Sequence, residues 1–183
     1  SEVERIKKAV EDLVRKLRKV SKETLDESRE LVKELKERDK ESEKDSRRLA
    51  ERLRKLLEEK NQTDLRKEVE DVVRDMERSN KESKDKTDEV ARELEESNRD
   101  NRRKVEEVVE RLRRLLEKLK RSTDRKVVKD ILDEVKKLID DIEEHSKRVA
   151  DRNRRLIEKI KKDTEDVIKR NRDLVTEIEK RIR

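Results

Sequence analysis

Hydroxyl and carboxamide side chains recur in this sequence at a fixed spacing of eighteen residues. The repeat is clearest where Ser79, Asn80 and Ser83 return as Ser97, Asn98 and Asn101. Such groups both donate and accept hydrogen bonds, and none of them ionises near neutral pH. Their chemistry is therefore mutual hydrogen bonding, which suits a site that holds protein segments in a fixed alignment.

The side chains that usually support catalysis or metal binding are scarce. His145 is the only histidine, and cysteine is absent. The adjacent Glu144 points in a different direction on a helix, and no second histidine is present to complete a zinc or di-iron site. We expect His145 to be a member or an edge residue of a polar network. The sequence predicts no metal, no cofactor and no bound small molecule.

Enzymatic activity is not expected. Nucleophilic triads, phosphate-binding loops and base-stacking platforms depend on Cys or His, on Gly-rich turns or on aromatic rings. The chain has no Gly, no Cys and no aromatic residue. A pair of catalytic carboxylates also needs a pocket, which a slender core without large side chains does not predict. We conclude that the sequence predicts a non-enzyme.

The composition predicts helix nearly throughout. Of the 183 residues, 59% are charged and 28% are hydrophobic, and there is no proline. Evolved globular domains rarely have such a composition. Leu, Glu, Lys and Arg dominate, and all of them favour helix. So little apolar sequence suits a thin core of long helices better than a thick globular one.

The charge pattern argues against nucleic-acid and membrane binding. The net charge of +6 is a small difference between 57 basic and 51 acidic residues, which alternate along the whole chain. Pairs four residues apart, such as Glu107 with Arg111 and Glu110 with Arg114, are typical of a solvated helix surface. No apolar run reaches the roughly 18 residues that span a bilayer. We expect a soluble protein without a targeting signal, expressed as a recombinant product in the cytoplasm, and its location is otherwise unknown.

Three long apolar stripes define the expected helices. They run from Val3 to Leu57, from Leu65 to Leu119 and from Val127 to Ile182, with polar gaps at 58–64 and 120–126. A single unbroken helix would leave its apolar face in water, so the gaps are predicted turns. The fold prediction is all-α: one up-down-up antiparallel three-helix bundle over 1–183, with helices at about 2–59, 64–120 and 124–182.

The polar gaps contain residues that can end or begin a helix. Asn61 tolerates the left-handed conformation that terminates a helix, and the side chains of several other residues can accept hydrogen bonds from free helical amides. The predicted caps are Thr63 or Asp64 for the second helix, Ser122, Thr123 or Asp124 for the third, and a capping box of Ser1 with Glu4 at the start.

The apolar stripe advances about 3.6 residues per step, so we expect nearly straight, coiled-coil-like helices whose layers repeat every eighteen residues, or five turns. Counting from turns centred near 61 and 122 brings the polar positions of all three helices to matching heights, in two buried bands. The first band contains Thr24, Ser28, Ser97, Asn98, Asn101, Ser146 and His145. The second contains Ser42, Ser46, Ser79, Asn80, Ser83 and Thr164, with Asp39, Asp45 and Asp163 close enough to join it.

Buried polar bands would fix the alignment of the helices. An apolar stripe can slip by one turn at little cost, whereas a polar band is satisfied only in the register that pairs its members. The alternative is that these side chains lie at the edge of the stripe and face water. Burial and cross-helix hydrogen bonds distinguish the two interpretations.

The layered Ser, Thr and Asn bands and the Glu, Lys and Arg surface resemble those of de novo designed helical bundles with buried hydrogen-bond networks. The resemblance implies a structural scaffold with high thermal stability and no natural substrate or required partner. An alternative is a designed module that self-associates as a homo-oligomer or accepts a partner helix. Asn153, Ile157, Asn171 and Val175 widen the third helix's face and leave room for such a helix.

Overall fold

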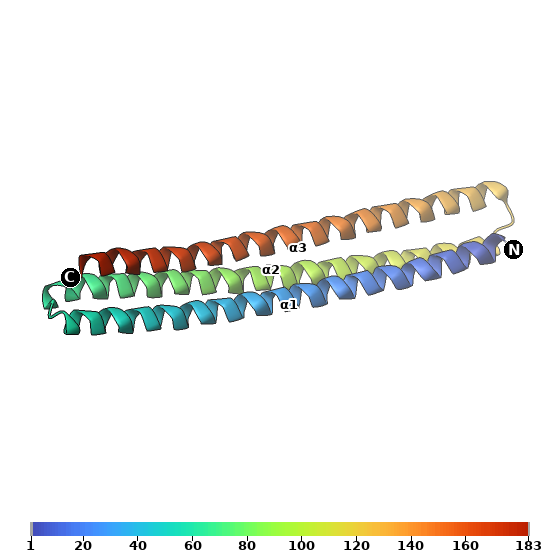
Figure 1. The fold of residues 1–183 in the computed structure, drawn as a ribbon. Helices are drawn as coiled ribbons and strands as arrows, with labels where there is room; N and C mark the ends of the chain where they lie inside the picture. Colours follow the sequence, from blue (N-terminus) through green and yellow to red (C-terminus); the bar gives the residue numbers. More distant parts are fainter. Residues whose placement is uncertain (1, 183) are drawn as a thin grey trace. The chain divides into compact units, whose positions relative to one another are not determined.

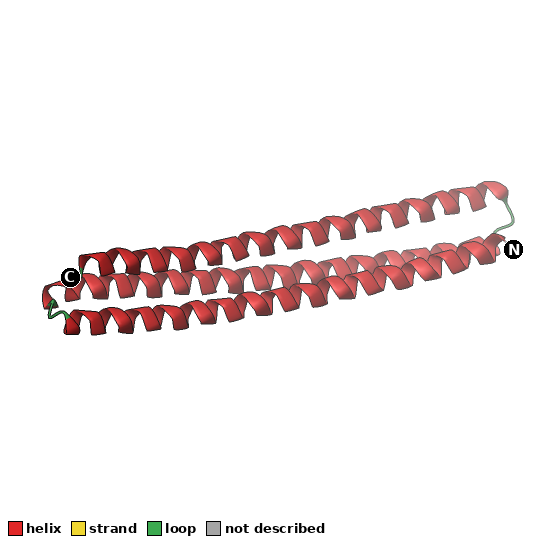
Figure 2. Cartoon of the chain, viewed as in Figure 1, coloured by secondary structure: helices red, strands yellow, loops and turns green. Residues whose placement is uncertain are grey.

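The computed structural model describes residues 2–182 and consists of three long helices. Helix α1 spans Glu2–Glu59, α2 spans Arg66–Arg121 and α3 spans Arg125–Arg181, and a short 3-10 helix, η1, covers Thr63–Leu65. Figure 2 shows that only two short connections interrupt the helical chain. The all-α, three-helix prediction is confirmed, and the helix ends lie within two residues of those expected.

The first connection is a Schellman motif, which is a standard way to end a helix. Asn61 has a positive φ of 52°. The Gln62 amide donates to the Leu57 carbonyl oxygen at 3.1 Å, and the Asn61 amide donates to the Glu58 carbonyl oxygen at 3.2 Å. Both bonds satisfy carbonyl groups at the end of α1 that have no partner within the helix. The left-handed conformation predicted for Asn61 is therefore present.

The caps that begin the next two helices differ from each other. Asp124 Oδ1 accepts the Lys126 amide at 2.9 Å, as expected for a cap of the third helix. No comparable side-chain cap by Thr63 or Asp64 is present in the described chain, so that prediction is wrong. The η1 turn leads into α2 instead, through a backbone bond from Leu65 to Gln62 at 3.3 Å. The predicted capping box includes Ser1, which lies outside the described residues.

Internal contacts divide the chain into two compact units, and each helix contributes one segment to each unit. Of the described residues, unit 1 contains 2–29 and 93–154, and unit 2 contains 30–92 and 155–182. Within unit 2, α1 and α2 run antiparallel, while α1 and α3 run parallel (Figure 1).

Each unit has its own apolar core made of aliphatic side chains. The unit 1 core is built around Val10, Leu17, Leu112, Leu119 and Ile142. The unit 2 core is built around Leu53, Val69, Met76, Val175 and Ile178. On the two helices that flank each connection, the buried polar residues lie further along the sequence from that connection than the apolar core does. The helices therefore place an apolar layer and a polar layer in each unit.

Candidate register-setting polar networks

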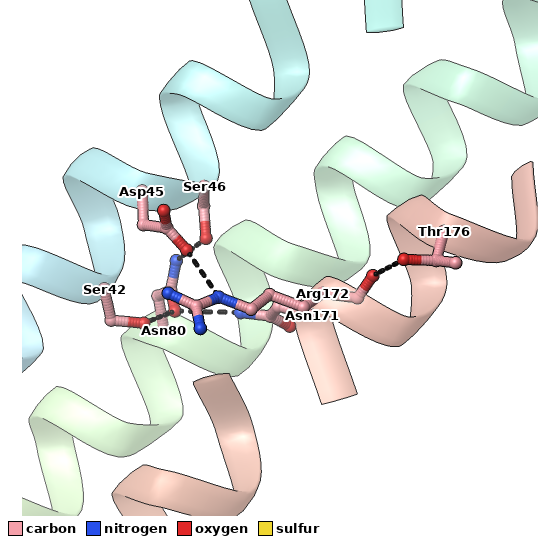
Figure 3. A network of polar contacts seen from close by, with 7 residues as sticks. All are labelled: Ser42, Asp45, Ser46, Asn80, Asn171, Arg172 and Thr176. Atoms are coloured by element: carbon pink, nitrogen blue, oxygen red, sulfur yellow. Dashed lines mark hydrogen bonds and ion pairs between the residues drawn. The ribbon is translucent and has the colours of Figure 1, made fainter. Parts of the chain in front are cut away.

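Asn80 joins all three helices of unit 2 through its carboxamide (Figure 3). Ser42 Oγ donates to Asn80 Oδ1 at 2.9 Å, and Asn80 Nδ2 donates to Ser46 Oγ at 3.0 Å, so both serines bind from α1. From α3, Asn171 Nδ2 donates to Asn80 Oδ1 at 3.1 Å. All four side chains are buried. We call this group the Asn80 network.

The geometry of the Asn80 network follows from helical spacing. Ser42 and Ser46 are four residues apart, so they lie on the same face of α1, one turn from each other. A carboxamide presents a donor and an acceptor side by side, and Asn80 uses the two groups on adjacent serines. Each bond contributes about 1 kcal/mol net, whereas a buried group left without a partner costs about 1–3 kcal/mol. The network therefore destabilises misaligned helices by more than it stabilises the aligned fold.

Ion pairs and one arginine–serine hydrogen bond surround this network in unit 2. Arg172 Nε lies 3.2 Å from Asp45 Oδ2, and Arg170 Nη2 donates to Ser79 Oγ at 2.7 Å. The pairs Arg38–Glu165, Asp45–Arg172 and Arg52–Glu179 recur every seven residues between α1 and α3. Exposed ion pairs contribute little individually, so we assign them a supporting role in the same alignment.

A second buried cluster in unit 2 contains a carboxylate. Ser83 Oγ donates to Asp39 Oδ1 at 2.9 Å, while Asp39 Oδ2 is buried without a partner in the described chain. Burial raises the pKa of Asp39 above its ordinary value, and the acidic neighbours Asp88 and Glu43 add to the increase. The Thr87 and Ser83 hydroxyls oppose it. Because the Thr87 proton points to the Ser83 carbonyl oxygen, at 3.1 Å, Ser83 is the firmer donor.

Unit 1 contains a related but smaller network between α2 and α3. Asn153 Nδ2 donates to Asn98 Oδ1 at 2.8 Å, and both residues are buried. Ser97 Oγ lies 3.4 Å from Asn153 Oδ1, and Ser146 Oγ lies 3.4 Å from Asn101 Oδ1. These longer contacts are weak hydrogen bonds. The network therefore depends chiefly on one amide pair, which we call the Asn98 network.

Three residues expected in the bands bind their own helix instead. The hydroxyls of Thr24, Ser28 and Thr164 donate to the carbonyl oxygens of the residues four positions earlier, each at 2.9 Å. Ser and Thr side chains commonly make this local bond, which competes with bonds between helices. The prediction that these three hydroxyls pair across helices is therefore wrong. The prediction of burial is confirmed for Ser28 and Thr164.

His145 is half-buried and makes no hydrogen bond or ion pair within residues 2–182. Burial lowers the pKa of His145, and the nearby positive charges of Lys104 and Arg148 lower it further. The imidazole is accordingly neutral near pH 7. The sequence predicts that His145 is either a member or an edge residue of the polar network. The structure places it at the edge.

Sequence reasoning left out several network members that the eighteen-residue repeat could have identified. Asn153 and Asn171 are eighteen residues apart and pair with Asn98 and Asn80, yet they were expected to face a fourth helix. Ile157 and Val175 on the same face are also buried within the units. Thr87 lies on the apolar stripe of α2 and is buried as well. The third helix's wide face is thus used inside each unit.

No group of three His, Cys, Asp or Glu side chains within residues 2–182 is placed to hold a metal ion. Grooves of about 430 Å³ in unit 2 and 450 Å³ in unit 1 lie between α1 and α2, and long Lys, Arg and Glu side chains line both. None of the helices over this range is long and apolar enough to cross a membrane.

Comparison with known proteins gives no relative. No protein-family model matches the sequence, and no curated protein or solved structure is similar to it. The function of the chain is therefore inferred from the geometry of the two networks.

Proposed function

We propose that this chain is a designed structural scaffold whose buried polar networks set the register and pairing of its helices. The Asn80 network carries the proposal, because one carboxamide binds α1 and α3 at once. A shift of α3 by one turn would separate Asn171 from Asn80 and leave the buried Asn171 Nδ2 group without its acceptor. The proposed scaffold has no catalytic role and requires no cofactor.

Composition supports the designed origin. The chain has no Gly, Pro or Cys, and 59% of its residues are charged. Equivalent polar residues repeat at eighteen-residue intervals, as in Asn80 with Asn98 and Asn171 with Asn153. In a designed sequence, the surface, the turns and the core are all chosen to favour one backbone structure. The regularity of this chain is consistent with such a choice.

Thiol cross-linking tests the register role. The pair Asp45→Cys with Arg172→Cys reports the observed register when a short bis-maleimide bridges the two thiols, since the arginine side chain spans the same gap in the ion pair. The pair Asp45→Cys with Thr176→Cys reports a shift of one turn. We expect the reagent to cross-link the first pair in clearly higher yield than the second. Adding Asn80→Leu and Asn171→Leu together should make the two yields comparable, because both carboxamides that join α2 to α3 are replaced.

Thr164→Val is the matched control, since this buried hydroxyl binds only its own helix. It should leave the cross-linking preference unchanged. If the preference also survives Asn80→Leu with Asn171→Leu, the register role is rejected. The alternative function, a module that self-associates, predicts a solution mass of two or more chains by light scattering, whereas the scaffold predicts one.

A further inference from the structure

The first segment of α1 is attached to unit 1 by few polar contacts. Arg18 pairs with Glu106 at 2.9 Å and Arg29 pairs with Glu95 at 2.7 Å, both on α2 and both exposed. Between residues 5–29 and the described part of α3, no side-chain hydrogen bond or ion pair is present. In unit 2, by contrast, three ion pairs join α1 to α3.

The buried polar groups of this segment are also incompletely paired. Asn98 corresponds to Asn80 eighteen residues earlier, and Ser28 corresponds to Ser46. Asn80 Nδ2 donates to Ser46, but Asn98 Nδ2 has no partner in the described chain although the residue is only 2% exposed. Ser28 donates to its own helix instead. The buried Ser21 hydroxyl, on the same segment, likewise has no partner within the described range.

The segment is therefore held mainly by apolar contacts. Val10, Val14 and Leu17 pack into the unit 1 core with residues of α2 and α3. Exposed ion pairs contribute little, and an unpaired buried amide opposes closure. A segment held mainly by apolar contacts opens locally more readily than one that buried hydrogen bonds also join to neighbouring helices.

We propose that the α2–α3 face of unit 1 is an exchangeable helix-binding site, which residues 5–29 occupy within the chain. Its preferred partner is an amphipathic helix with three features. An apolar stripe would replace Val10, Val14 and Leu17, and two Arg eleven residues apart would meet Glu95 and Glu106. A carboxamide opposite Asn98 would accept its free amide hydrogen.

Each feature follows from this face. Glu95 and Glu106 are themselves eleven residues apart, or about three turns, so they lie along one edge of the groove. A carboxamide at position 28 would place an acceptor oxygen further from its helix than the Ser28 hydroxyl, which does not accept from Asn98 Nδ2 in this structure. Charge complementarity and a single unpaired donor thus define the partner's chemistry.

Hydrogen exchange of the full chain tests the opening. Residues 10–25 of α1 and residues 160–175 of α3 are helical segments of equal length, but the second segment belongs to unit 2, where α3 has polar attachments to both partner helices. We expect amide protection in the first segment to be at least about tenfold lower. Equal protection of the two segments would overturn the proposal.

Peptide binding to the full chain tests the site itself. The acceptor carries Leu17→Glu, which weakens the resident segment, and the labelled peptide has the sequence of residues 2–29 with Ser28→Asn. We expect this acceptor to bind the peptide at least about tenfold more tightly than the unmodified chain, where the resident segment competes at high effective concentration. A peptide that retains Ser28 should bind several-fold more weakly.

The control peptide carries Leu17→Glu itself and should not bind. If both peptides bind equally, or if Ser28→Asn gives no gain in affinity, the site is not the one described and the proposal is wrong. Circular dichroism of the Leu17→Glu acceptor must retain most of its helical signal. Should that acceptor unfold completely, Val14→Ala replaces it as a milder weakening of the same apolar contact.

Discussion

Asp39 illustrates how a single residue in this core can both specify and destabilise the fold. Its carboxylate accepts one hydrogen bond from Ser83, while the other oxygen is buried without a partner in the described chain. No cation lies among the groups that shift its pKa, since Asp88 and Glu43 are both acidic. Burial of a carboxylate under these conditions favours the protonated form.

We predict that Asp39→Asn increases stability at neutral pH and that the increase disappears in acid. The folded pKa of Asp39 is raised above 3.8. The wild-type contribution from this residue is therefore fully present below pH 3.8 and is lost as the pH rises through the raised value. The variant should gain about 1 kcal/mol at pH 7 in urea unfolding.

Asp45→Asn provides the matched control for that measurement. Asp45 is half-buried and pairs with Arg172, so its replacement should change the unfolding free energy by less than about 0.5 kcal/mol, in the destabilising direction. A gain for Asp39→Asn that is the same at pH 7 and pH 3.5 would contradict the assignment of a buried ionised carboxylate.

The helices themselves could be predicted closely, because apolar period and turn chemistry are local properties. Asn61 and Asp124 behave as their residue types suggest. The partners of the polar side chains could not be predicted as well. Ser28 and Ser46 have the same type and spacing, yet Ser28 donates to its own helix and Ser46 accepts from Asn80. A periodic pattern gives the height of a hydroxyl but not which neighbouring group bonds to it.

Asn61, which has a left-handed conformation after the end of α1, should affect how stably that helix terminates. Asn61→Gly should leave stability unchanged or raise it by a few tenths of a kcal/mol, because glycine has no Cβ to clash at a φ of 52°. Asn61→Ile should reduce it by about 1–2 kcal/mol, since β-branched side chains disfavour this region. Chemical unfolding followed by circular dichroism measures both.

The control for the turn is the neighbouring exposed residue Lys60, whose φ is not positive. Lys60→Ile adds the same apolar side chain one residue earlier and should cost much less than Asn61→Ile. Equal losses at the two positions would show that exposure of an apolar side chain, rather than backbone conformation, is responsible.

Across the whole molecule, the two units contain the same eighteen-residue repeat, but the repeated side chains make different numbers of hydrogen bonds. Asn80 makes three hydrogen bonds to other helices, whereas Asn98 accepts one from Asn153 and has an unpaired amide. The difference arises on α1, where Thr24 and Ser28 bond locally but Ser42 and Ser46 do not. Equivalent sequence positions therefore differ in what they contribute to register and stability.

This inequality predicts that Asn80→Leu and Asn98→Leu have different effects, although each exchanges the same residue types on α2. Asn80→Leu leaves Asn171 Nδ2 buried without its acceptor and also removes the bonds to Ser42 and Ser46, so a loss of about 1–3 kcal/mol is expected. Asn98→Leu removes one such bond but also eliminates an amide that already lacks a partner. Its net effect should be at least about 1 kcal/mol smaller, measured by urea unfolding of the full chain under identical conditions. Equal losses would mean that Asn98 Nδ2 is satisfied in solution, and the distinction between the two networks would then have no energetic consequence.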